Sequence, residues 1–162
     1  MSRAALAAML APLLVMTAAM PAGAADDPTS FASAAEVRST ITAMEREMKP
    51  GQGFAWRPVL RSGDTAVALE IWKKPGRPAV HPDQAEYVTV MAGSGTLISG
   101  GRLDEPSTTR PDLIEGRRIV GGTTRALKPG DVALIPAGTP HWFGITGSRL
   151  VLLGTKLTQA SR

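Results

Sequence analysis

The only two histidines of this 162-residue chain lie in two separate stretches that are rich in turn-forming residues. His81 is followed five residues later by Glu86, and His141 follows a Pro-Ala-Gly-Thr-Pro segment. Two imidazoles and one carboxylate are suitable ligands for Fe(II), Mn(II), Zn(II) or Ni(II), and they leave coordination positions open for water or a substrate. These residues therefore predict a divalent transition-metal site if the fold brings them together.

Strand periodicity predicts where these side chains point. Side chains alternate along a strand, so Glu86 shares one face with Val88 and Val90, and His141 shares its face with Phe143. If those apolar faces are interior, Glu86 is a buried carboxylate, which is unfavourable unless a positive or hydrogen-donating group meets it. The alternative is a barrel in which the three polar side chains hydrogen-bond one another and bind no metal.

The segment 130–143 would position His141, because it reads as a turn at Gly130, a short apolar strand, a second turn and a new strand that opens on the histidine. After Gly51 the chain consists of short alternating segments, and its 17 glycines and 13 prolines suit many turns. The expected strands are 54–60, 65–72, 86–92, 95–99, 118–120, 123–127, 131–135, 142–146 and 149–156. This pattern predicts an all-β, antiparallel sandwich or small barrel.

Two further elements accompany the predicted strands. A capping box from Ser33 to Glu36 opens a predicted helix over residues 34–48. The apolar stripe of this helix consists of Val37, Ile41, Met44 and Met48. It would cover a sheet or make a dimer contact. Residues 102–122 are long for a hairpin loop and are expected to form an extra hairpin or a lid.

The two histidine stretches resemble the paired motifs of the cupin superfamily, small antiparallel β-barrels that often hold a divalent metal. The second cupin motif is matched in full by Gly130, Pro136, Gly138 and His141. The end of the first motif is matched by His81, Glu86 and Gly93. The resemblance covers about residues 54–156. It implies a jelly-roll cupin barrel with a metal held by His81, Glu86 and His141.

Two positions depart from the cupin pattern. The family has another histidine two residues before His81, where this chain has Ala79, and Ile145 stands where an asparagine usually follows the last histidine. A second alignment makes His81 the first histidine and Asp83 a replacement for the second, but its spacing to Glu86 is one residue short. With Ala79 in place of a fourth ligand, the remaining set would resemble the facial arrangement of oxygen-activating non-haem iron sites.

Parity also assigns the neighbouring side chains. The residues expected to line the barrel or form its core are Val88, Val90, Leu134, Phe143 and Leu152. Glu70 lies on the opposite face of its strand from Leu69 and Ile71, so we expect it to be exposed.

The first 24 residues read as a cleavable signal peptide with a positive start, an apolar run and a small-x-small cleavage site. The predicted organisation is a signal peptide over 1–24, a leader and helix over 25–50, and a cupin domain over 51–158. The apolar run over 4–19 is shorter than the ~20 residues of a bilayer span, so no stable membrane anchor is expected. These features predict a periplasmic or secreted protein.

Composition narrows the function classes. The net charge of +4 is mild and the basic residues are scattered, which argues against a nucleic-acid partner. The chain has no cysteine, so disulfides and thiolate ligands are excluded. The cupin resemblance also implies a homodimer.

Three functional hypotheses follow. The first is a metal-dependent enzyme of oxygenase, isomerase or lyase type that acts on a small molecule. The second is a non-catalytic cupin that binds a small ligand, such as a sugar or an organic acid, beside a degenerate metal site. The third is a structural dimer with a vestigial cavity.

Overall fold

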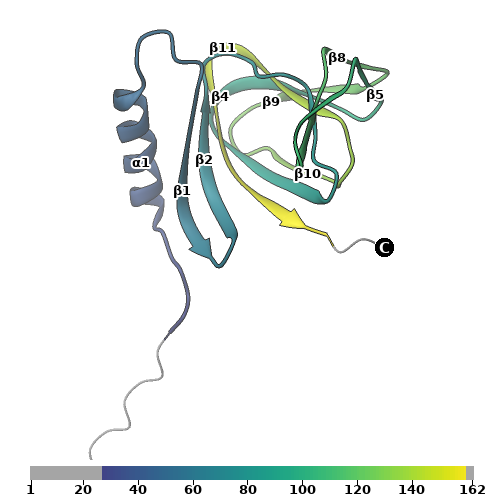
Figure 1. Ribbon diagram of the computed structural model, residues 1–162. Helices are drawn as coiled ribbons and strands as arrows, with labels where there is room; N and C mark the ends of the chain where they lie inside the picture. The colour runs from purple at the N-terminus through teal and green to yellow at the C-terminus, as the bar shows by residue number, and fades with distance from the viewer. Residues whose placement is uncertain (1–26, 160–162) are drawn as a thin grey trace, which may run out of the picture.

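The computed structural model describes residues 27–159, which form one helix packed against the outside of a β-barrel (Figure 1). The predicted signal peptide over residues 1–24 lies outside this range. Within residues 27–159, no helix has the length and apolar character needed to cross a membrane.

Helix α1 (Ala34–Glu47) begins at the Ser33 capping box, in which Ser33 and Glu36 bond each other's backbone N–H groups. The strands that follow are β1 (Phe54–Ser62), β2 (Thr65–Trp72), β3 (Ala79–Val80), β4 (Gln84–Ser99), β5 (Arg102–Asp104), β6 (Ser107–Arg110), β7 (Leu113–Glu115), β8 (Arg118–Val120), β9 (Thr123–Leu127), β10 (Val132–Ile135) and β11 (His141–Thr158). The predicted helix and the predicted all-β antiparallel class are both confirmed.

The two longest strands, β4 and β11, pair antiparallel from one end to the other. The N-terminal half of β4 also pairs with β10, and its C-terminal half pairs with β9. The C-terminal half of β11 continues the sheet to β2 and β1, whereas its first residue pairs with β3. Residues at the two ends of β11 therefore reach the same interior.

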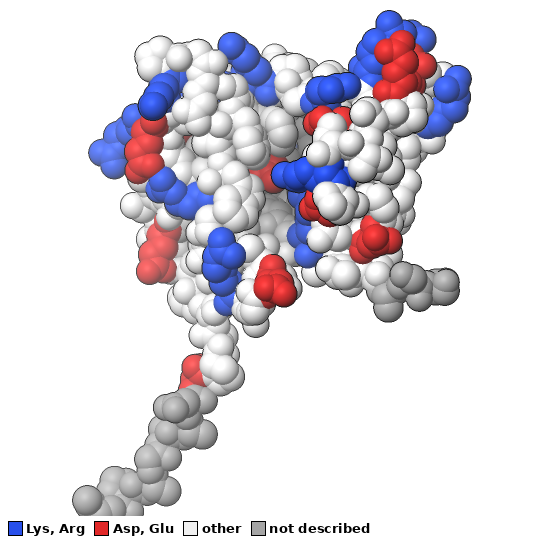
Figure 2. Space-filling view, in the orientation of Figure 1, with Lys and Arg blue, Asp and Glu red and all other residues white. Residues whose placement is uncertain are grey.

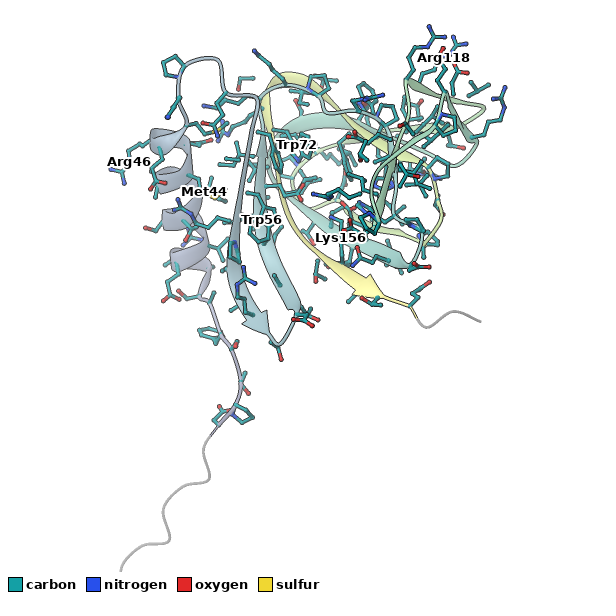
Figure 3. All side chains as sticks on the ribbon, in the orientation of Figure 1. Met44, Arg46, Trp56, Trp72, Arg118 and Lys156 are labelled. Atoms are coloured by element: carbon teal, nitrogen blue, oxygen red, sulfur yellow. The ribbon has the colours of Figure 1, made fainter. Side chains whose placement is uncertain are left out.

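Two apolar clusters lie on opposite faces of this sheet. The inner cluster fills one part of the barrel and consists of Val88, Val90, Leu97, Leu127, Ile135, Phe143, Leu150 and Leu152. In the outer cluster, Val37 and Met44 of α1 pack on Leu69, Ile71 and Val151. Figure 3 shows Met44 directed from the helix toward the sheet, while Trp72 and Lys156 lie on the barrel side.

The outer cluster explains why the expectation for Glu70 is wrong. Leu69 and Ile71 face the helix, so the alternating residue Glu70 faces the barrel interior, where it is half-buried and lines a cavity. The apolar face of β2 is therefore the outer one, because α1 covers it.

The expectation that Leu134 belongs to the core is also wrong. Leu134 is 63% exposed, and it pairs with Tyr87 on the outer face of β4. Its neighbours Ala133 and Ile135 face the inner cluster instead. The short strand β10 is apolar on both faces, so hydrophobicity alone did not reveal its orientation.

Two predicted pairs of strands are single strands. Residues 86–92 and 95–99 lie in the continuous β4, and 142–146 and 149–156 lie in β11. Residues 102–122 form two small ladders, because β5 pairs with β8 and β6 pairs with β7. The expected extra hairpin is thus present, and β7 joins it to β3.

Candidate metal centre

Three short segments bring the predicted ligands together. His81 lies between β3 and β4, Glu86 lies near the start of β4, and His141 opens β11. The backbone N–H of Gly138 donates to the carbonyl oxygen of His81 at 2.8 Å, so the turn before His141 is tied to the His81 segment. A positive φ of 73° at Gly138, favourable for glycine, shapes this turn.

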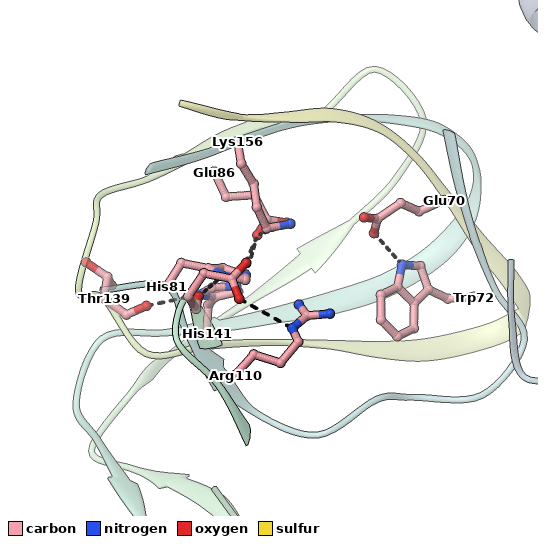
Figure 4. Close-up of polar contacts among 9 residues, drawn as sticks. Glu70, Trp72, His81, Glu86, Arg110, Thr139, His141 and Lys156 are labelled. Atoms are coloured by element: carbon pink, nitrogen blue, oxygen red, sulfur yellow. Dashed lines mark hydrogen bonds and ion pairs between the residues drawn. The ribbon is translucent and has the colours of Figure 1, made fainter. Parts of the chain in front are cut away.

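The three side chains converge inside the barrel (Figure 4). The Nε2 atoms of His81 and His141 lie 3.5 and 3.3 Å from Oε2 of Glu86. All three residues are buried, with exposed fractions of 5–6%. One potential ligand atom from each lies within 4.8 Å of the others, so small side-chain movements would suffice to bring all three to metal-bonding distances of about 2.0–2.2 Å. The structure therefore brings together every site residue that the sequence predicts.

Backbone carbonyls orient both rings. Nδ1 of His81 lies 2.9 Å from the carbonyl oxygen of Asp112, and Nδ1 of His141 lies 3.0 Å from that of Thr139. A carbonyl oxygen only accepts, so each Nδ1 carries a hydrogen, and each ring turns its Nε2 toward Glu86. This arrangement, in which a carbonyl fixes the tautomer of a ligating histidine, is typical of metal sites.

The electrostatics favour a charged carboxylate and neutral histidine at the centre. Burial alone would raise the pKa of Glu86, but contacts with His141, Lys156 and His81 outweigh it and lower that pKa to about 2. Burial lowers the pKa of His81, and the neighbouring charge of Lys156 acts in the same direction. A carboxylate and a neutral imidazole are the protonation states that bind a divalent cation.

Solved structures with the same architecture come from several kinds of protein. Hydroquinone 1,2-dioxygenase from Sphingomonas sp. TTNP3 matches with a TM-score of 0.51 and 15% identity, over 68% of this chain and 69% of that one. TT1209 from Thermus thermophilus has a TM-score of 0.49 and 19% identity, with coverage of 72% and 94%. An oxalate oxidase has a TM-score of 0.47 and 18% identity, and the match covers 67% of this chain but 53% of the oxidase.

No family model and no curated protein matches this sequence. The hydroquinone dioxygenase, which matches with a TM-score above 0.5, has the cupin fold. This chain folds as a cupin barrel. At this level of identity the likeness establishes the fold alone.

Ala79, which the predicted motif alignment places at the position of the first cupin histidine, lies beside the three predicted ligands. Ala79 pairs with His141 in the sheet and lines the same cavity as His81 and Glu86. A methyl group there leaves one side of the candidate metal centre open toward the cavity. Within residues 27–159, three side chains that could bind a metal therefore converge at this point, His81, Glu86 and His141.

Sequence reasoning missed two charged residues beside the ligands. Nζ of Lys156 lies 3.5 Å from Oε2 of Glu86, its register partner on β11. Glu70 accepts a 2.9 Å hydrogen bond from Nε1 of Trp72, and burial and the charge of Glu86 raise the pKa of Glu70. The alternation of side chains along the strand could have indicated that Lys156 points inward, because Lys156 shares its face with Leu152, a predicted core residue.

Proposed function

We propose that this protein is a metal-dependent cupin enzyme that holds one divalent transition metal through His81, Glu86 and His141 and acts on a small molecule. One observation carries the proposal: three potential ligand atoms, two imidazole nitrogens and a carboxylate oxygen, converge in a buried site. A metal ion would bind all three atoms at once, and the donor set suits Fe(II), Mn(II), Zn(II) or Ni(II).

The surrounding residues suit chemistry on a small molecule. When bound, such a metal supplies Lewis-acid chemistry, and iron or manganese also supplies redox chemistry. The inner apolar cluster closes one side of the site, which excludes water there and strengthens electrostatic interactions. Glu70 and Lys156 provide a carboxyl group and an ammonium group that can hydrogen-bond a substrate.

The contact between Lys156 and Glu86 favours a second candidate function. The Lys156 ammonium lies close enough to compensate the charge of Glu86 in a metal-free barrel. A protein that used this pair instead of a metal would be a non-catalytic cupin that binds a small ligand. The metal content of the purified protein separates the two candidates.

Export to the periplasm or the medium stays a prediction from residues 1–24. Homodimer formation likewise stays a prediction from the cupin resemblance.

The first test is elemental mass spectrometry on tag-free protein after anaerobic incubation with Fe(II), Mn(II), Zn(II) and Ni(II). We expect about one equivalent of metal in the parent, because three ligands converge at one point. Glu86→Gln should weaken metal retention by about tenfold or more, since it removes the anionic ligand. Glu70→Gln is the matched control, because it makes the same change at a carboxyl group of the same cavity that is not a predicted ligand, and it should retain the metal.

Circular dichroism would verify that both variants keep the β-fold. Equal metal retention by Glu86→Gln and the parent would refute the ligand assignment. A metal-free parent in all four incubations would support the ligand-binding alternative.

A further inference from the structure

A cavity opens directly from the candidate metal centre. Two adjoining pockets share Glu70, Glu86, Arg110 and Lys156 in their walls. The inner pocket, of about 340 Å³, also touches both histidines, and the outer pocket has about 500 Å³. Volumes in this range accommodate small molecules. Figure 2 shows this face of the molecule hollowed, with acidic atoms inside the hollow and basic side chains at its rim.

The inner end of the cavity carries a fixed positive group. Lys156 extends inward from β11, and 34% of its side chain is exposed. In the structure its ammonium faces Glu86. A divalent metal on Glu86 would compensate that carboxylate, and the Lys156 ammonium would then be available to another anion.

The acidic groups around the cavity do not cancel this charge at the inner end. Glu70 is held by the indole N–H of Trp72, and burial favours its neutral form. Asp112 faces Arg110 near the mouth, where its Oδ1 lies 3.4 Å from the Arg110 Nε. Asp64 belongs to the outer of the two pockets and is exposed, and Glu115 of the inner pocket faces Arg77, whose Nη1 lies 3.9 Å from the Glu115 Oε2. With a metal bound, the inner end therefore has a net positive charge.

The inner pocket also has an apolar wall. The rings of Phe54 and Trp72 contact each other at a tilt of 45° with their centroids 4.3 Å apart, and both residues line this pocket together with Phe143. A ligand with an anionic end and an apolar body would place the two ends against matching surfaces.

We infer that the substrate class of this cupin is a small carboxylate, whose anionic group binds the ammonium of Lys156 beside the metal and whose apolar part packs on Phe54 and Trp72. This inference rests on the proposed function, because the metal is what frees Lys156 from Glu86. Lys156 is a substrate-binding residue in this account and not a metal ligand.

Calorimetric titration with matched probes tests the inference. Each carboxylate is paired with its neutral amide: benzoate with benzamide, and lactate with lactamide. On metal-loaded protein we expect at least one carboxylate to bind about tenfold or more tightly than its amide, because charge-assisted hydrogen bonds are the stronger ones. Lys156→Met should abolish this preference, and Lys156→Arg should largely restore it.

Lys128→Met is the matched control, since Lys128 is exposed before β10 and lines neither of the two pockets. It should leave the preference unchanged. The metal content of every sample is measured before titration. Metal-free parent should distinguish acid from amide less than the loaded protein does, because Glu86 then holds Lys156.

Metal-loaded parent that binds acid and amide equally, or binds no probe of either pair, overturns the inference and leaves the metal site standing. A preference that survives Lys156→Met overturns it as well. Failure of the proposed function is seen separately, as the absence of metal in the loaded parent.

Discussion

At the residue scale, the two histidine rings are held by backbone carbonyls rather than by side chains. The carbonyl oxygens of Asp112 and Thr139 fix which nitrogen each ring presents to Glu86. Because no side chain performs this task, substitutions around the rings leave the tautomers in place as long as the two loops keep their shape. Ring orientation at the candidate centre therefore depends on loop geometry.

The pH dependence of stability should reveal the half-buried Glu70. Its pKa is raised by burial and by Glu86, so the folded protein keeps this proton above the ordinary glutamate value of 4.5, where the unfolded chain releases it. The free energy of unfolding of the metal-free parent should consequently fall, relative to Glu70→Gln, as pH rises above 4.5. Urea unfolding of both proteins across that range measures the difference.

At pH 4 the carboxyl is protonated in the folded state and largely protonated in the unfolded state, so the loss of stability relative to Glu70→Gln should hardly have begun there. A difference that stays constant with pH, or that shifts toward the parent as pH rises, would show that Glu70 ionises freely in the folded protein.

The ligands were predictable at this scale, but the residues around them were not. Glu86 has Val88 and Val90 on its face, so strand parity suffices to turn it inward. Glu70 has apolar neighbours of the opposite parity, and parity alone turns it outward. Only the packing of α1 on Leu69 and Ile71 reverses that result, and this contact joins segments distant in the sequence.

At the scale of elements, β4 and β11 position the site, because they carry Glu86 and His141 and pair with each other from end to end. Gly95 lies where the two strands approach closely: a Cβ at this position would collide with the carbonyl oxygen of Gly144. The sequence predicts a break near this glycine, since glycine usually interrupts strands. In the structure the strand continues, and the glycine allows a close approach.

Gly95→Ala should therefore destabilise the barrel by about 1–3 kcal/mol through overpacking, as measured by urea unfolding. Gly147→Ala is the matched control, because its Cβ would meet only the Ser94 hydroxyl at 2.8 Å, and that side chain can rotate away. Equal stability of the two variants would mean that β4 and β11 can separate at Gly95 without cost.

At the scale of the whole molecule, the inner apolar cluster fills one part of the barrel interior and the polar cavity occupies another. Helix α1 supplies a second apolar layer on the outside of the sheet, so the inner faces of β2 and β11 can carry Glu70 and Lys156. The barrel class followed from turn spacing and alternation. The position of the cavity did not, because it depends on which sheet face the helix covers.

The most direct test of the proposed metal centre is a crystal structure of the metal-loaded protein, with anomalous diffraction data collected at the absorption edge of the metal. We predict a single anomalous peak at about 2.0–2.2 Å from the Nε2 atoms of His81 and His141 and from a carboxylate oxygen of Glu86. We also predict that the Lys156 ammonium has moved away from Glu86. No peak at this position, with Lys156 still paired to Glu86 in crystals soaked with each metal, would contradict the proposed metal centre.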